Sequence, residues 1–133
     1  MEFPAQLSSL QPILDFLRTS LVASEELQKK LELAVEEVVV NIISYSHSSQ
    51  ISMEVREEHG MAFITIKDWG DPFNPLDHRE EKQDQNPVEA MKEGGLGIFF
   101  LKKLMDEVTY ERSSGQNILR MKKNLFHAEE ATG

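Results

Sequence analysis

Three short groups of residues in this chain have the types and spacing for acid–base and metal chemistry. Glu37 and Asn41 lie four positions apart in an apolar stretch, and Asp68 opens the turn-forming segment DWGDPFNP. A third group, GGLG at 94–97, precedes another apolar stretch. A carboxylate can accept a proton, a carboxamide oxygen can bind Mg²⁺, and glycine amides before a helix can bind phosphate. Their order within 133 residues favours one nucleotide site.

Glu37 and Asn41 lie one turn apart on a predicted helix, on nearly the same face and beside its apolar stripe. Glu37 can orient or deprotonate an attacking hydroxyl, and Asn41 can coordinate Mg²⁺, which takes few protein ligands. Alternatively, Glu37 belongs to a solvated helix edge and Asn41 is a surface residue. Asn41, however, interrupts the apolar runs 38–40 and 42–43, where another apolar residue would cost less. We therefore expect a polar group to meet Asn41.

Asp68 ends a predicted central strand and starts a turn through Gly70 and Pro72. Asp at such a position commonly forms an Asx turn with its own backbone. It can also accept a hydrogen bond from an adenine amino group, and Gly70 would leave room for the base to approach the backbone. Phe73 is counted with the nucleotide-binding residues of this turn, although a core position would explain it equally well.

The candidate phosphate-binding segment consists of Gly94, Gly95, Leu96, Gly97 and Ile98. The predicted helix that it opens, to about Met105, is apolar enough to dock firmly. A docked helix N-terminus preceded by flexible glycine amides is suited to bind phosphate. The glycines could instead end one helix and begin the next.

The elements that position these groups form an alternation of helices and strands. Helices are predicted over 7–21 and from the N-cap Ser24 to about His47, and hydrophobic alternation predicts strands at 51–55, 62–66, 107–111 and 117–122. His59-Gly60 is predicted to form a hairpin turn. The polar segment at about 76–93 predicts a lid, and residues 127–133 a polar tail. We expect a single domain over 1–126.

Composition limits the classes of partner. With 23 acidic and 14 basic residues, the net charge of −9 repels nucleic-acid phosphates, so no direct nucleic-acid partner is expected. The absence of cysteine removes disulfides and thiolate zinc sites. No apolar run approaches a membrane span, and the N-terminus has no signal-peptide pattern, which favours a cytoplasmic protein with no membrane association.

Together these segments resemble a known superfamily. Glu37-x-x-x-Asn41, the DWGDPFNP segment and EGGLGI at 93–98 resemble the N, G1 and G2 boxes of the GHKL ATPase/kinase superfamily. LAVEE at 33–37, the Pro-Phe-Asn-Pro form of the G1 box and NILRMK at 117–122 are similar to the small bacterial anti-sigma-factor serine kinases of the RsbW and SpoIIAB type. The resemblance extends from about Phe3 to Lys123.

The resemblance implies a Bergerat-type α/β two-layer sandwich, with a mixed, mainly antiparallel sheet and its helices on one face. It implies ATP and Mg²⁺ as cofactors. Glu37 would be the catalytic base, Asn41 the Mg²⁺ ligand and Asp68 the acceptor for adenine, with Gly70 beside it. The matching phosphate-loop glycines are Gly95 and Gly97. The family often has His four residues after the N-box Asn and an aromatic residue two further on, whereas this chain has Tyr45 and His47 there.

The resemblance also implies protein partners. Such kinases phosphorylate a serine or threonine of an anti-anti-sigma (STAS-domain) protein, sequester a sigma factor and commonly form homodimers. No His precedes Glu37, so the acceptor helix of a sensor histidine kinase is not expected, and the chain should act on a separate protein. The alternative is an ATP-gated binding module that sequesters a sigma factor or another regulator without significant kinase activity.

Overall fold

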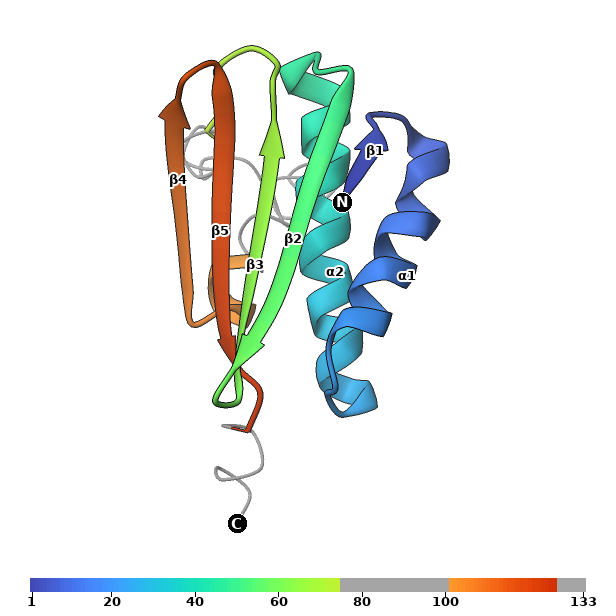
Figure 1. Ribbon diagram of the computed structural model, residues 1–133, viewed down its shortest axis with the longest axis vertical. Coiled ribbons are helices and arrows are strands. Elements are labelled where there is room, and N and C mark those ends of the chain that lie inside the picture. The colour runs from blue at the N-terminus through green and yellow to red at the C-terminus, as the bar shows by residue number, and fades with distance from the viewer. Residues whose placement is uncertain (75–100, 127–133) are drawn as a thin grey trace, which may run out of the picture.

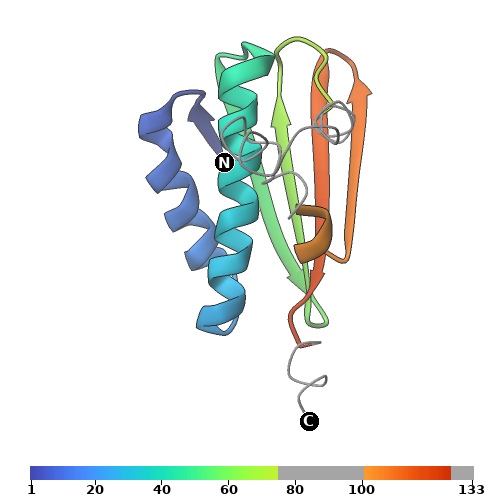
Figure 2. The same cartoon turned by 180° about the vertical axis from the view of Figure 1, so that it is seen from behind.

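The computed structural model describes residues 1–74 and 101–126. They form two layers, a five-stranded sheet and two helices that cover one of its faces (Figures 1 and 2). The helices are α1 (Leu10–Ser20) and α2 (Glu25–Asn41), with a short 3-10 turn η1 (Leu7–Ser9) and a π-helical turn η2 (Ile42–Ser46). The strands are β1 (Glu2–Pro4), β2 (Gln50–Glu58), β3 (Met61–Asp68), β4 (Glu107–Ser113) and β5 (Gln116–Asn124).

The strand order is β1-β2-β3-β5-β4, so β3 is the central strand, as predicted for the strand that Asp68 ends. All four described pairings are antiparallel, where the prediction allowed a mixed, mainly antiparallel sheet. The register of β3 with β5 places Asp68 opposite Asn117 and Ile66 opposite Leu119. Both pairs face the helices, because side chains on a strand alternate between the two faces.

Two tight turns connect the paired strands. His59 and Gly60 have φ angles of 53° and 80°, and Ser114 and Gly115 have φ angles of 53° and 79°. Two-residue turns with positive φ at both positions match the right-handed twist of a hairpin. The predicted turn at His59-Gly60 is thereby confirmed.

The second helix begins as its sequence predicts. The Leu27 N–H donates to Oγ of Ser24 at 3.2 Å, and Glu25 and Glu26 occupy the first turn, where the helix dipole favours acids. All members of the predicted apolar stripe are buried: Leu27, Leu31, Ala34, Val38 and Ile42. They pack against the core-facing side chains of the sheet, including Met53, Ile64 and Ile66.

The second helix ends where it was predicted to end, but its last turn is not α-helical. The α-helix stops at Asn41, continues as the wider η2 turn, and ends at His47 in the left-handed region with φ 61°. Ser46 is fully buried and donates to the Ile42 carbonyl at 3.0 Å. The turn at the end of β3 packs over Ser46, which accounts for its burial.

Several predicted features fall outside the described residues. These are the lid at about 76–93, the glycine-rich segment at 94–98 and the tail at 127–133. Residues 101–104 are helical, and Leu101 and Met105 are buried, in agreement with the end of the predicted third helix. Within residues 1–74 and 101–126, no helix is long and apolar enough to cross a membrane.

Candidate functional site

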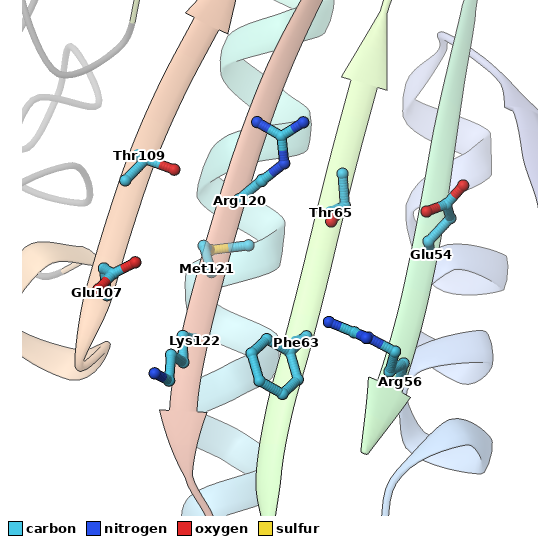
Figure 3. Close-up of a pocket in the computed structure, with 9 residues that line it drawn as sticks. All are labelled: Glu54, Arg56, Phe63, Thr65, Glu107, Thr109, Arg120, Met121 and Lys122. Atoms are coloured by element: carbon cyan, nitrogen blue, oxygen red, sulfur yellow. The ribbon is translucent and has the colours of Figure 1, made fainter. Parts of the chain in front are cut away.

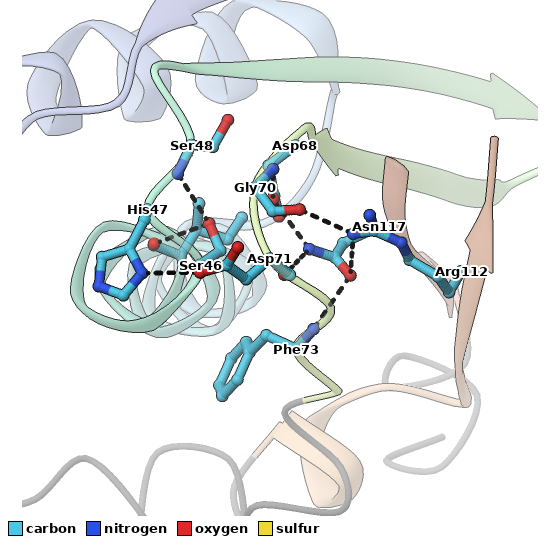
Figure 4. Close-up of polar contacts among 10 residues, drawn as sticks. Ser46, His47, Ser48, Asp68, Gly70, Asp71, Phe73, Arg112 and Asn117 are labelled. Atoms are coloured by element: carbon cyan, nitrogen blue, oxygen red, sulfur yellow. Dashed lines mark hydrogen bonds and ion pairs between the residues drawn. The ribbon is translucent and has the colours of Figure 1, made fainter. Parts of the chain in front are cut away.

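A close junction joins the end of the second helix to the turn after β3 (Figure 4). The Asp71 N–H donates to the Ser46 carbonyl at 2.6 Å, and the Trp69 N–H donates to Oγ of Ser48 at 3.1 Å. Nδ1 of His47 lies 3.0 Å from Oδ2 of Asp71. These contacts fix the end of α2 against the turn that Asp68 begins.

Gly70 lies at the tightest point of this junction. A Cβ atom at position 70 would lie 2.0 Å from the Ser46 carbonyl oxygen and 2.8 Å from its Oγ. Packing alone therefore requires glycine here, because the nearest atoms belong to backbone that cannot move aside cheaply. Its predicted role in admitting a base stays a prediction.

Asp68 is a buried carboxylate, with 2% of its surface exposed. Its Oδ1 accepts from the Gly70 N–H at 3.0 Å, which is the predicted Asx turn, and from Nδ2 of Asn117 at 2.9 Å. Within the described part of the chain, no group donates to Oδ2. This oxygen is therefore the one that can accept a hydrogen bond from a bound group.

Asn117 was not singled out as a site residue from the sequence. It is 4% exposed and faces Asp68 across the β3–β5 pair. The sequence offered one indication: Asn117 shares with Leu119 and Met121 the face of the strand that points into the core. A polar side chain on that face requires hydrogen-bond partners. Its partner, Asp68, is 49 residues away in the sequence, so the pairing itself could not be read from spacing.

A small cavity lies beside Asp68 and Asn117. Its volume is about 20 Å³, which is room for about one water molecule, so a nucleobase requires its described walls to move apart. The walls are apolar apart from Asp68, Asn117 and the Tyr110 hydroxyl. The lining residues come from the second helix, β3, β4, β5 and the turn: Val38, Ile42, Ile66, Asp68, Phe73, Tyr110, Asn117 and Leu119.

Phe73 is half-buried and forms part of this wall. Its ring stacks on Tyr45, with centroids 5.2 Å apart and an interplanar angle of 24°. Tyr45 is one of the two positions at which the chain departs from the family pattern, and this contact gives it a structural role. The other position, His47, makes the contact with Asp71 at the junction.

Glu37 is a half-buried carboxylate on α2. Burial, followed by the like charge of Glu36, raises the pKa of Glu37 to about 7. A carboxyl group with a pKa near neutrality can take up and release a proton at physiological pH. The prediction that Glu37 is simply a solvated helix edge does not explain this environment.

Asn41 lies one helical turn beyond Glu37 and is 4% exposed. The prediction placed Asn41 beside the apolar stripe of the helix. The structure instead buries it inside the packed layer. Its Nδ2 is buried, and no hydrogen-bond partner for it exists among the described residues. Buried polar groups in native proteins are nearly always paired, so this carboxamide has the character of a group that meets a ligand.

The remaining predicted site residues are Gly94, Gly95, Leu96, Gly97 and Ile98, all outside the described residues. In the described part of the chain, no three His, Cys, Asp or Glu side chains cluster so that they could hold a metal ion by themselves. Val38 and Ile42, which follow Glu37 and Asn41 along the helix, line the same cavity as Asp68. The structure thus brings the first two predicted segments to one end of the molecule.

A larger hollow of about 500 Å³ lies on the opposite face of the sheet, which the helices leave uncovered (Figure 3). It is lined by Glu54, Arg56, Phe63, Thr65, Glu107, Thr109, Arg120, Met121 and Lys122. Arg56 lies over the Phe63 ring at 4.3 Å, and Lys122 lies 5.9 Å from its centroid. No predicted site residue lines this hollow, so the candidate site lies on the other face of the sheet.

Comparison with a family model and with individual relatives assigns the chain to the same family. Residues 3–123 match the family described as "Histidine kinase-like ATPase domain". The serine-protein kinase RsbW of Oceanobacillus iheyensis is 30% identical over 114 residues, which cover 80% of this chain and 70% of that protein. RsbW of Staphylococcus epidermidis is 33% identical over 101 residues, which cover 68% of this chain. The aligned region spans 62% of the length of that relative.

Comparison with solved structures concerns the fold. The histidine kinase domain of the blue-light activated kinase of Erythrobacter litoralis EL346 has a TM-score of 0.58 at 17% identity, covering 96% of this chain and 64% of that one. The histidine kinase AdeS of Acinetobacter baumannii has a TM-score of 0.55 at 12% identity, covering 94% of this chain and 68% of that one. The predicted Bergerat-type α/β fold is confirmed.

Proposed function

Because the chain belongs to the histidine kinase-like ATPase domain family, and within it to the group of the RsbW serine-protein kinases, we propose that it is a Mg-ATP-dependent protein serine/threonine kinase and an anti-sigma factor. Residues 1–126 form its single kinase domain, with a lid at about 76–93 and a polar tail at 127–133. Its place of action is the cytoplasm. Its substrate is a serine or threonine of an anti-anti-sigma (STAS-domain) protein.

The observation that carries this proposal is the pair formed by Glu37 and Asn41. A half-buried carboxyl group with a pKa of about 7 lies one helical turn from a buried carboxamide whose Nδ2 has no partner in the described part of the chain. Neither feature stabilises the protein by itself, because one is a desolvated acid and the other an unsatisfied polar group. Both are explained by a bound, charged substrate.

The nucleotide base is assigned to the cavity beside Asp68. Oδ2 of Asp68 accepts from the adenine amino group, and Val38, Ile42 and Ile66 contact the apolar faces of the base. Gly70 keeps the turn close to Ser46, and Phe73 closes one wall. The phosphates are assigned to the backbone amides of Gly94, Gly95, Leu96, Gly97 and Ile98, at the start of the third helix.

Asn41 is the residue that fits Mg²⁺. A carboxamide oxygen is an acceptable hard ligand for Mg²⁺, and the donor Nδ2, unpaired within residues 1–74 and 101–126, leaves this side chain open to a bound group that accepts a hydrogen bond. When bound, Mg²⁺ would neutralise negative charge that develops on the phosphates during transfer. Among the described residues, Asn41 would be the one to hold the ion.

Glu37 supplies the proton acceptor of the reaction. The acceptor hydroxyl forms a new bond from its oxygen to the γ-phosphorus, the bond from that phosphorus to the β–γ bridging oxygen breaks, and the hydroxyl proton passes to Glu37. ADP leaves with the bridging oxygen. Such transfer depends mainly on positioning and charge neutralisation, so few protein groups are needed. A pKa of about 7 allows Glu37 to accept this proton and release it to water afterwards.

The proposed partners are proteins. Besides the anti-anti-sigma substrate, the chain binds a sigma factor, with nucleotide state and phosphorylation deciding which partner is held, and it acts as a homodimer. The formal charge of −9 steers association toward partners with a basic surface. No direct contact with nucleic acid is part of this proposal.

The test is a pull-down from a lysate with and without Mg-ATP, followed by transfer of labelled γ-phosphate to each captured protein. We expect one small captured protein to become phosphorylated on serine or threonine. Glu37→Gln should reduce the rate by about 10²- to 10⁴-fold, the usual contribution of a general base, with ATP binding retained. Glu26→Gln, an exposed acid at the start of the same helix, is the matched control and should transfer at the wild-type rate.

The alternative, an ATP-gated module without kinase activity, makes a different prediction in the same experiment. It expects ATP-dependent capture of a partner with no labelled product, and no difference between Glu37→Gln and the wild type. Failure of the wild-type protein to bind Mg-ATP at millimolar concentration would contradict both functions.

A further inference from the structure

We propose that Asn117 is the positioning residue of the base-binding end of the site: its carboxamide holds the Asp68 carboxylate and the 70–73 turn in the geometry that receives the nucleotide base. This inference rests on the proposed function, because it concerns the residue behind the group that meets the base. Asn117 lines the same cavity as Asp68 but faces it across the β3–β5 pair.

The carboxamide of Asn117 uses all of its hydrogen-bonding capacity (Figure 4). Its Nδ2 donates to Oδ1 of Asp68 at 2.9 Å and to the Asp71 carbonyl at 2.7 Å. Its Oδ1 accepts from the Phe73 N–H at 3.1 Å and from the Tyr110 hydroxyl at 2.5 Å. One side chain thereby holds the carboxylate and two points of the turn that forms the cavity wall.

The orientation of this carboxamide is determined by its partners. The groups on the Nδ2 side, a carboxylate and a backbone carbonyl, are acceptors only. On the Oδ1 side are the Phe73 N–H, which only donates, and Nη1 of Arg112 at 3.3 Å. A flipped amide would place its oxygen against two acceptors and its NH₂ against donors, so the assigned orientation is the stable one.

Arg112 extends the network to the other side of the turn. Its Nη1 donates to the Gly70 carbonyl at 2.8 Å, close to its contact with Oδ1 of Asn117. Gly70, Asp71 and Phe73 are therefore attached to a single cluster on β4 and β5. Residues on the sheet, rather than within the turn, decide where the turn lies.

The network also decides what Asp68 can recognise. With donors from Gly70 and Asn117 both directed at Oδ1, the second oxygen is left as an acceptor, and no described group competes for it. An amino group on the ligand is therefore favoured at this place, and a carbonyl oxygen there is repelled. Asn117 acts through Asp68, without contact to the reacting atoms.

The test is Asn117→Asp, which keeps size and shape but replaces the donor facing Asp68 by an acceptor. At about pH 8, two facing carboxylates repel each other, and we expect affinity for ADP to fall about tenfold or more relative to the wild type. Toward about pH 5.5, one shared proton restores a donor between them, and the ratio of affinities should return toward one. The readout is calorimetric binding of ADP across this pH range.

The ratio of the two ADP affinities, wild type to Asn117→Asp, reports on Asp68 and position 117 alone, because other groups that change with pH affect both proteins equally. The charged and titratable residues that face it, from the described elements around it, are Tyr110 and Arg112 on β4 and Asp71 with its neighbour His47. All four are present in both proteins, as is the ligand's own titration. Asn124→Asp, the same change at the other end of β5, is the matched control and should bind ADP like the wild type at every pH.

Two results would overturn the inference. One is wild-type affinity of Asn117→Asp at about pH 8, and the other is a loss of affinity that does not vary with pH, as expected for purely structural damage. A second measurement uses the wild type alone: the side-chain amide signals of Asn117 in NMR spectra should shift on ADP addition more than those of Asn124, and an equal response contradicts the inference. If the wild type does not bind ADP, the proposed function fails first.

Discussion

Two buried asparagines at one end of the molecule have opposite surroundings. Asn117 and Asn41 are each 4% exposed. Asn117 makes hydrogen bonds from both ends of its carboxamide, to Asp68 and the turn after it. Asn41 has a buried Nδ2 without a partner among residues 1–74 and 101–126. The same side chain at the same burial is thus satisfied by the fold in one place and unsatisfied in the other.

The difference separates two kinds of binding region. The polar groups of Asp68 and Asn117 are preorganised, because the protein supplies the hydrogen bonds that orient them before any ligand arrives. The region around Glu37 and Asn41 carries a cost in the free protein, a desolvated acid and an unsatisfied amide. A phosphate oxygen can accept from the unpaired amide and a substrate hydroxyl can donate to the carboxylate, so the second region gains its interactions on binding.

The two regions are linked by the junction between Ser46 and the turn at Gly70. The Asp71 N–H donates to the Ser46 carbonyl at 2.6 Å, and Gly70 leaves no room for a side chain beside it. A shift of the turn would therefore be transmitted to the end of the second helix, which carries Asn41. The same substitution, Asn to Leu, can be made at position 117 and at position 41, and its effects on the free energy of unfolding can be compared.

The largest effect is expected from Asn117→Leu. The change keeps a similar volume but removes the contacts of Asn117 with the Asp71 carbonyl, the Phe73 N–H and Oδ1 of Asp68, and this oxygen then keeps the Gly70 N–H. We expect the free energy of unfolding to fall by about 3 kcal/mol, since each unpaired buried group costs about 1–3 kcal/mol and the turn can relax in part. Urea denaturation measures it. A loss below about 0.5 kcal/mol would remove the distinction between the two asparagines.

Asn41→Leu should act in the opposite direction on stability. Replacing an unsatisfied buried carboxamide by an apolar side chain removes a desolvation penalty, so unfolding of the free protein should cost about 1 kcal/mol more. Binding of Mg-ATP should be lost in the same variant. Thermal unfolding with and without Mg-ATP reports both effects, and destabilisation of the ligand-free protein would show that Asn41 has a structural role instead.

The smallest effect concerns Glu37→Gln and the pH dependence of stability. The pKa of Glu37 is raised from 4.5 to about 7, so the folded state binds the proton more tightly than the unfolded state. The contribution of Glu37 to the free energy of unfolding is fully present below about pH 4.5 and is lost as the pH rises to about 7. Glu37→Gln should therefore exceed the wild type in stability by an amount that grows over this window and is constant above it.

We expect that gain to reach about 1 kcal/mol, since solvent screening of a half-exposed carboxylate reduces the effect that its pKa alone would give. Urea denaturation of both proteins at several pH values within this window measures it. A difference between the two proteins that stays constant with pH would contradict the raised pKa of Glu37.

Local patterns predicted most of the secondary structure. The Ser24 cap, the apolar stripe of α2 and the His59-Gly60 turn depend on residues a few positions apart, and all are confirmed. The second helix was predicted to run to about His47 and does so, but after Asn41 it widens from α-helix into η2, where the turn after β3 packs on Ser46. That contact joins residues far apart in the sequence, so local periodicity could not reveal it.

The candidate site was predicted in part. Glu37, Asn41 and Asp68 carry chemistry that their types and spacing indicate, and the first two segments lie at the same end of the molecule. Asn117 was missed as a site residue because its importance comes only from facing Asp68 across the sheet. The glycine-rich segment at 94–98 stays a prediction.

The sequence by itself determined which side chains can accept a proton, bind a cation or end a strand in a turn, because those properties belong to single residues and their near neighbours. Only the tertiary structure decided which of these groups are buried, which are paired and which lack a partner in the described part of the chain. Burial and pairing depend on the register of β3 with β5 and on the packing of the helix end against the turn. Both arise from contacts between distant segments, and they give Asn41 and Asn117 their different surroundings.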